Sequence, residues 1–168
     1  MCQSDHLRCW RGAQDSKVER KMVLVAGDLV SAETILVVED NILVLKVVEA
    51  ILRTAGFEVL VAGSAKKAML LEVSFSGTID LLLSDIVMPD MCGPDLAKAM
   101  KERRPNMRVM MMSGYADGAL LILNYGWHFI KKPFLPKALI QAVKDVLSSE
   151  YGELKTDSFD VRQGLNQP

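Results

Sequence analysis

The chain has 168 residues, half of them hydrophobic, and a formal net charge of −1 at pH 7. This length and hydrophobic content are typical of one globular domain with flanking segments. The balanced charge predicts no general attraction to nucleic acid or to an acidic membrane surface, so partners must be bound by local sites.

The N-terminal part of the chain contains no targeting or metal-binding pattern. The three cysteines, Cys2, Cys9 and Cys92, have no paired spacing, which indicates neither a disulfide framework nor a zinc module and favours a reducing, cytoplasmic setting. The apolar stretch at 22–30 is too short to cross a bilayer, and no signal-peptide pattern precedes it. We therefore treat residues 1–33 as an arm of unknown order and expect no membrane association.

From residue 34 the sequence alternates between strand and helix patterns. Short apolar runs predict strands at 34–38, 58–62, 79–84, 108–113 and 128–130. Helical periodicity and helix-start or helix-end residues predict helices at 41–55, 64–74, 94–103, 116–124 and 136–148. The first, third and fourth strands are nearly unbroken apolar runs, as expected for central strands of a parallel sheet.

Five strand-and-helix repeats with right-handed crossovers predict an α/β fold. The simplest arrangement is a flavodoxin-like, doubly wound (βα)5 sandwich with the parallel strand order 2-1-3-4-5. The domain is expected to span 34–149, with 150–168 as a C-terminal tail that is too short for a DNA-binding helix-turn-helix output module. Residues that follow the strands should gather along one edge of the sheet, where ligands bind in such folds.

Polar residues stand at the ends of four predicted strands. Glu39 and Asp40 follow the first strand, Asp85 follows the third, Ser113 ends the fourth and Lys132 follows the fifth. Three neighbouring carboxylates repel one another, and one takes up a proton unless a cation compensates them. Mg²⁺ prefers oxygen ligands, lysine supplies a compact positive charge and serine supplies a hydroxyl donor. The set therefore predicts a magnesium-dependent site for a phosphoryl group.

Four motifs resemble those of two-component response-regulator receiver domains, the CheY-like family. They are TILVVEDN at 34–41, LLLSDIVMPDMCGPDLA at 81–97, MMSGYAD at 111–117 and FIKKPF at 129–134. They occur in the family's order and at its separations. The style of CGPDLA and GWHFIKKPF is similar to receivers attached to hybrid sensor histidine kinases.

The resemblance implies that Asp85 is the phosphoacceptor. Its phosphoryl group would come from a phosphohistidine on a sensor histidine kinase or a histidine phosphotransfer protein. Mg²⁺ would be held by Asp40, Asp85 and the backbone carbonyl of Val87, with Glu39 acting mainly through water. The chain would then be a phosphoacceptor with at most slow autodephosphorylation, rather than an enzyme.

The resemblance also implies a switch. Ser113 and Lys132 would bind the phosphoryl oxygens, and Phe129 takes the position of the family's aromatic switch residue. Phosphorylation would draw Ser113 and Lys132 inward and repack a protein-interaction surface beside Phe129. Leu135 departs from the family pattern, which has serine or threonine before the proline, so the last helix is expected to lack its usual cap.

Other interpretations of the same residues stay open. Taken singly, Asp85 is an ordinary turn or cap residue and Lys132 an ordinary solvated charge. A phosphatase of the haloacid dehalogenase type also uses a strand-terminal aspartate and Mg²⁺, but it needs a second aspartate where Val87 stands. A receiver-like binding module that is never phosphorylated is the main alternative, and it is expected where the acids or the lysine are lost.

Two surface hypotheses complete the sequence-based expectations. The run ALLIL at 119–123 is more apolar than an exposed helix should be, so residues 116–148 are expected either to form a homodimer face or to bury that run in the core. Val87 and Tyr115 stand at positions that flank the phosphoryl group in the family that the chain resembles, and their side chains should hinder water, which predicts slow loss of phosphate. The sequence identifies neither the kinase nor the target, and it leaves open whether the chain is free-standing or part of a longer protein.

Overall fold

A computed structural model describes residues 22–25, 28–114 and 126–149. The strands are β1 Met22–Val25, β2 Asp28–Ser31, β3 Thr34–Val38, β4 Glu58–Ala62, β5 Leu81–Asp85, β6 Arg108–Ser113 and β7 His128–Lys131. The helices are α1 Ile42–Thr54, α2 Ala65–Ser74, α3 Gly93–Arg103 and α5 Pro136–Ser148. The predicted helix at 116–124, the tail at 150–168 and residues 1–21 of the arm lie outside the described residues.

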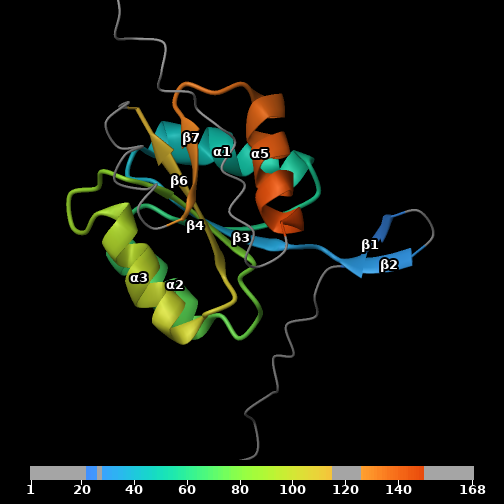
Figure 1. Cartoon of the computed structure of the whole chain (residues 1–168), viewed down its shortest axis with the longest axis horizontal. Coiled ribbons are helices and arrows are strands. Elements are labelled where there is room, and N and C mark those ends of the chain that lie inside the picture. Colours follow the sequence, from blue (N-terminus) through green and yellow to red (C-terminus); the bar gives the residue numbers. More distant parts are fainter. Residues whose placement is uncertain (1–21, 26–27, 115–125, 150–168) are drawn as a thin grey trace, which may run out of the picture.

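Five strands form one parallel sheet in the order β4-β3-β5-β6-β7. In chain order of the five domain strands this is 2-1-3-4-5, so the predicted doubly wound topology is confirmed. Helices α1 and α5 cover one face of the sheet, and α2 and α3 cover the other (Figure 1). The carboxyl ends of all five strands therefore lie along one edge.

The sheet is held by two apolar layers, one on each face. Alternate residues of β3 enter opposite layers, so that Leu36 packs with α2 and α3 while Ile35 packs with α1 and α5. The methionine run of β6 behaves in the same way, with Met111 on the α2–α3 side and Met110 on the other. Because the central strands are buried on both faces, their sequences read as continuous apolar runs.

Most helix boundaries follow local signals in the sequence. The side chain of Asn41 accepts hydrogen bonds from the first-turn amides of α1, and that of Ser64 accepts one in α2. Gly56, with φ of +96°, follows Ala55, the C-cap residue of α1, which is a common place for a glycine in the left-handed region. Leu135 precedes α5 without any side-chain cap hydrogen bond, so the expected loss of the cap is confirmed.

The structure corrects two details of the predicted elements. The third strand of the domain spans Leu81–Asp85 rather than 79–84, because Asp85 still pairs with Met112 of β6. The arm also contains a two-stranded antiparallel sheet, β1 with β2, where the sequence analysis predicted no element. Its signal was present, since two apolar runs flank a glycine, which is a common hairpin pattern.

None of the described helices is both long enough and apolar enough to cross a membrane.

Candidate functional site

Three acidic side chains meet at the carboxyl edge of the sheet. Glu39 and Asp40 directly follow β3, and Asp85 is the last residue of the neighbouring strand β5. Since Val38 pairs with Ser84 across these strands, Glu39 and Asp85 lie at the same level. Each of the three residues contributes a carboxylate oxygen, and these oxygens lie within 4.8 Å of one another. The predicted convergence of the three acids is confirmed.

The three acids differ strongly in their exposure to solvent. Glu39 is almost completely buried, Asp85 is partly buried and Asp40 is exposed. Burial raises the pKa of the Glu39 carboxyl above its usual range, and the hydrogen bond and positive charge of Lys132 offset part of that rise. The negative charge of Asp85 raises the same pKa further. A buried acid beside two others therefore needs a positive partner to stay ionised.

Lys132 supplies that partner from the opposite side of the cluster. It follows β7, and its backbone amide donates a hydrogen bond of 2.7 Å to the carbonyl of Ser113 at the end of β6. Its ammonium Nζ lies 2.5 Å from Oε2 of Glu39 and 3.1 Å from Oδ2 of Asp85. Strand pairing thus carries a lysine 47 residues beyond Asp85 in the sequence into direct contact with it.

The donor set suits a hard divalent cation. Three carboxylates meet a single ammonium group, so acidic groups outnumber the positive charge that the protein itself supplies at the cluster. Carboxylate oxygens are preferred ligands of Mg²⁺, which also keeps several of its waters and so suits an open cluster with one exposed acid. Glu39, Asp40 and Asp85 would hold the ion.

The carboxylate and the backbone of Asp85 are fixed by separate contacts. Its Oδ1 accepts a hydrogen bond of 2.7 Å from the amide of Ile86, which leaves Oδ2 facing Lys132. The loop after β5 then returns, and the amide of Gly93 donates a hydrogen bond of 2.9 Å to the carbonyl of Ile86. The first residue of α3 is thereby held against the end of β5.

Gly93 makes this close approach feasible. A Cβ atom built there would lie 2.1 Å from the carbonyl oxygen of Asp85 and 3.1 Å from Sδ of Met111, so no larger residue fits without movement of the backbone. Sequence analysis did not single out Gly93. A glycine immediately before the proline that opens a helix was the available signal, but its partner atom is visible only in three dimensions.

The other predicted site residues occupy different surroundings. Ser113 is buried at the end of β6, one residue beyond the level of Asp85, and so reaches the same edge as the acids. Val87 lies in the loop after β5 with its side chain 68% exposed. Phe129 of β7 is half-buried and packs against the apolar layer on the α2–α3 side. Tyr115 lies outside the described residues.

Comparison with known sequences places most of the chain in one protein family. Residues 35–144 match the family model described as response regulator receiver domain. The sensor kinase CckA of Brucella abortus (strain 2308) is 33% identical over 141 residues, which cover 82% of this chain and 14% of that protein. The DNA-binding transcriptional regulator NtrC of Azospirillum brasilense is 34% identical over 124 residues, which cover 71% of this chain and 25% of NtrC. The chain thus spans a minor part of these relatives.

Solved structures of isolated receiver domains match nearly along their whole length. A CheY-like response regulator receiver domain protein from Methanospirillum hungatei JF-1 has a TM-score of 0.63 and 32% identity, covering 70% of this chain and 94% of its own. The receiver domain of the hybrid histidine kinase CckA has a TM-score of 0.59 and 38% identity, covering 68% of this chain and 98% of its own. The similarity to a hybrid-kinase receiver agrees with the style of the sequence motifs.

Replacing Gly93 by alanine should disturb the site through the backbone of Asp85. The added methyl group would force α3 away from β5, and we expect the free energy of unfolding to fall by about 1–3 kcal/mol and Mg²⁺ to bind more weakly. Gly63→Ala is the matched control, because a Cβ there meets nothing within 4 Å. Urea denaturation and calorimetric Mg²⁺ titration would measure both effects. A Gly93→Ala protein that matches the parent in both would contradict the proposed packing constraint.

Replacing Lys132 by methionine should make the fold more dependent on Mg²⁺. The change leaves the buried carboxylates without their internal cation, which should cost on the order of 3 kcal/mol of unfolding free energy in the absence of metal. Because Mg²⁺ no longer competes with the ammonium, the stability gained on adding Mg²⁺ should exceed that of the parent. The measurement is urea denaturation with and without Mg²⁺, with the exposed neighbour Lys131→Met as control. An equal gain in all three proteins would refute the competition.

Proposed function

Because the chain belongs to the response regulator receiver family, we propose that it accepts a phosphoryl group on Asp85 from a phosphohistidine of a partner protein, in a Mg²⁺-dependent reaction. The observation that supports this most is the meeting of Glu39, Asp40 and Asp85 with the ammonium of Lys132 at one edge of the sheet. The acids supply the nucleophile and the ligands of the ion, and the lysine supplies a cation for the incoming anion.

In the proposed transfer, a carboxylate oxygen of Asp85 attacks the phosphorus atom. The new oxygen–phosphorus bond forms as the phosphorus–nitrogen bond to histidine breaks, and the bonding electron pair returns to the imidazole nitrogen. When bound, Mg²⁺ supplies positive charge to the oxygens of the transferred group. Lys132, already 3.1 Å from Asp85, neutralises the growing negative charge, and the hydroxyl of Ser113 donates a hydrogen bond to a phosphoryl oxygen. Catalysis is chiefly positioning and electrostatic stabilisation.

The rim of the site suits a protein donor. Ile42 and Leu43 at the start of α1 are 57% and 71% exposed. They come directly after Glu39, Asp40 and the helix cap residue Asn41 in the sequence. Val87 is exposed two residues after Asp85. Apolar side chains around a charged centre are typical of a surface that another protein covers while it delivers its phosphohistidine. A sensor histidine kinase or a histidine phosphotransfer protein is therefore the proposed partner.

Phosphorylation is proposed to act as a switch on the surface beside β7. The phosphoryl group draws Ser113 and Lys132 toward Asp85, and Phe129 repacks, because Ser113 ends β6, Phe129 lies in β7 and Lys132 directly follows β7. The homodimer through residues 116–148 stays a prediction, since its apolar run lies outside the described residues.

Acetyl phosphate with Mg²⁺ tests the proposed chemistry in a reaction that needs no partner. We expect one stable phosphoryl group per chain. In Asp85→Asn the extent of labelling should fall on the order of 100-fold or more, because an amide is a much weaker nucleophile than a carboxylate. Asp90→Asn, in the same loop but outside the acidic cluster, should label normally. Catalytic release of phosphate would instead favour the phosphatase. Absence of labelling in the parent would favour the binding module that is never phosphorylated.

The rate of phosphate loss tests the proposal that this phosphoacceptor has at most slow autodephosphorylation. Valine at position 87 offers no hydrogen bond to water, whereas asparagine can hold and orient a water molecule beside the phosphoryl group. We expect Val87→Asn to lose phosphate several-fold faster than the parent in a radiolabel decay assay. Val73→Asn, an exposed valine on α2, is the matched control and should decay at the parental rate. Equal decay in all three proteins would rule out shielding by Val87.

A further inference from the structure

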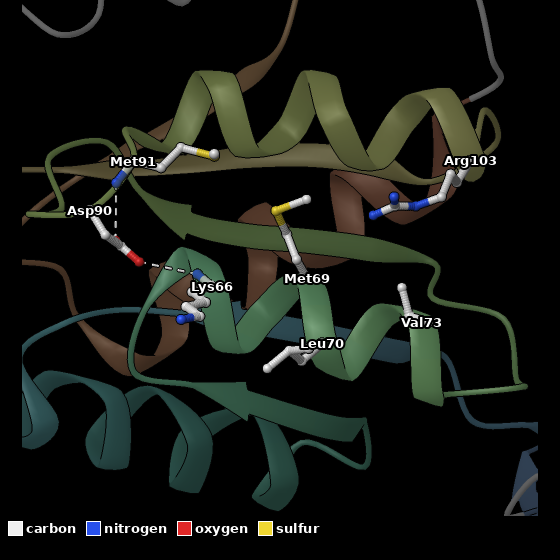
Figure 2. A pocket seen from close by; sticks show the side chains of 7 residues that line it. All are labelled: Lys66, Met69, Leu70, Val73, Asp90, Met91 and Arg103. Atoms are coloured by element: carbon white, nitrogen blue, oxygen red, sulfur yellow. Dashed lines mark hydrogen bonds between the residues drawn. The ribbon is translucent and has the colours of Figure 1, made fainter.

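A groove of about 430 Å³ lies between α2 and α3, on the face of the sheet opposite α1 and α5 (Figure 2). We call it the α2–α3 groove, and it is lined by Lys66, Met69, Leu70, Val73, Asp90, Met91 and Arg103. Leu70 and Val73 are 64% and 71% exposed, although both are large apolar residues. Among the described residues, no element covers them.

The width of the groove is fixed by an ion-pair cluster at the end where α2 and α3 both terminate. The buried carboxylate of Glu72 on α2 accepts hydrogen bonds of 2.9 Å from both Arg103 and Arg104. Arg104 also donates to the backbone carbonyls of Glu72, Phe75 and Gly77, at 2.9, 2.7 and 2.7 Å. These contacts tie the end of α3 to the end of α2, so the groove exists before any occupant binds.

The groove carries surplus positive charge at one of its ends. At one end the guanidinium groups of Arg103 and Arg104 face a single carboxylate. At the other end Lys66 and Asp90 balance in charge, and the Asp90 carboxylate accepts a hydrogen bond from the Lys66 amide. Backbone hydrogen bonds of this kind lower the pKa of Asp90, so it stays ionised and the balance holds at neutral pH. An apolar groove with one basic end suits an apolar segment that carries acidic residues.

The C-terminal part of this chain has that composition. The segment 153–161 reads ELKTDSFDV and lies outside the described residues. It combines three apolar residues with three acids and a single lysine. The apolar residues are Leu154, Phe159 and Val161, and the acids are Glu153, Asp157 and Asp160.

The segment starts from a point that allows it to reach the groove. The carbonyl of Ser149, just after α5, accepts a hydrogen bond of 3.2 Å from Arg108, the first residue of β6. A short loop joins Arg108 to the end of α3, so the tail leaves the domain at the sheet edge where the Arg103 end of the groove lies. Ten extended residues to Phe159 span up to about 33–36 Å. The ten residues of α2 are only about 15 Å long.

We propose that residues 153–161 bind in the α2–α3 groove of the same chain, with Phe159 against Leu70 and Val73 and the acids facing the Arg103 end. The proposal does not depend on phosphorylation of Asp85. In this arrangement the tail covers the exposed apolar side chains of α2, and an acidic, apolar segment of another protein would have to displace it.

Amide chemical shifts of the full chain test the proposal. Phe159→Ser should shift the amides of Leu70, Val73 and Arg103 and leave that of Val47, an exposed valine on α1, in place. Leu165→Ser is the matched control in the same tail and should shift none of them. If Phe159→Ser leaves the groove amides unchanged, the tail does not occupy the groove and the proposal fails.

Charge and concentration complete the test. Asp157→Lys with Asp160→Lys should reproduce the shifts of Phe159→Ser, because the introduced lysines would repel the Arg103 end. A synthetic peptide of residues 153–161, added to the Phe159→Ser chain, should restore the parental shifts. Parental shifts that persist on tenfold dilution support binding within one chain. Chemical shifts that change on dilution would instead show that the tail of a second copy of the chain occupies the groove, and the proposal of binding within one chain would fail.

Discussion

The contact of the Lys132 ammonium with Glu39 and Asp85 is the interaction on which the rest of the site depends. A carboxylate as buried as that of Glu39 is costly to ionise without a cation beside it. The lysine directly follows β7, the edge strand two positions from β5 in the sheet, so the site forms only when β6 and β7 are paired in register. Folding of the sheet and assembly of the acidic cluster are therefore one event. This coupling explains why the proposed chemistry uses residues from segments far apart in the chain.

Much of the fold could be predicted because each element carries its own local signal. The central strands are apolar on both faces, and Asn41 or Ser64 precedes a helix that it caps. The meeting of Glu39, Asp40 and Asp85 was also predictable, because parallel strands bring their carboxyl ends to one edge. The prediction of a site thus rested on topology as much as on residue type. An isolated aspartate after a strand carries no such information.

Other features depend on packing between segments with no periodic relation. Which of Glu39 and Asp40 is buried is decided by the direction each side chain takes as β3 ends, and Lys132 contacts Glu39 more closely than it contacts Asp85. Glu72 and Arg104 are 32 residues apart in the sequence and form an ion pair. Arg104 also donates to the backbone carbonyl of Gly77, a contact that residue composition cannot predict. The exposed apolar residues of α1 were likewise not foreseen. Their spacing alone cannot distinguish a core stripe from a surface.

The close approach of Gly93 to the carbonyl of Asp85 has an evolutionary consequence. Position 93 accepts one amino acid as long as α3 begins where it does, because even a methyl group would overlap the oxygen. A descendant of this chain could lose the glycine only by shifting the helix along its axis or lengthening the loop before it. Substitution of Gly93 is therefore linked to insertions or deletions in the preceding loop. Among diverging copies of this chain, the substitution and the change in loop length should appear together.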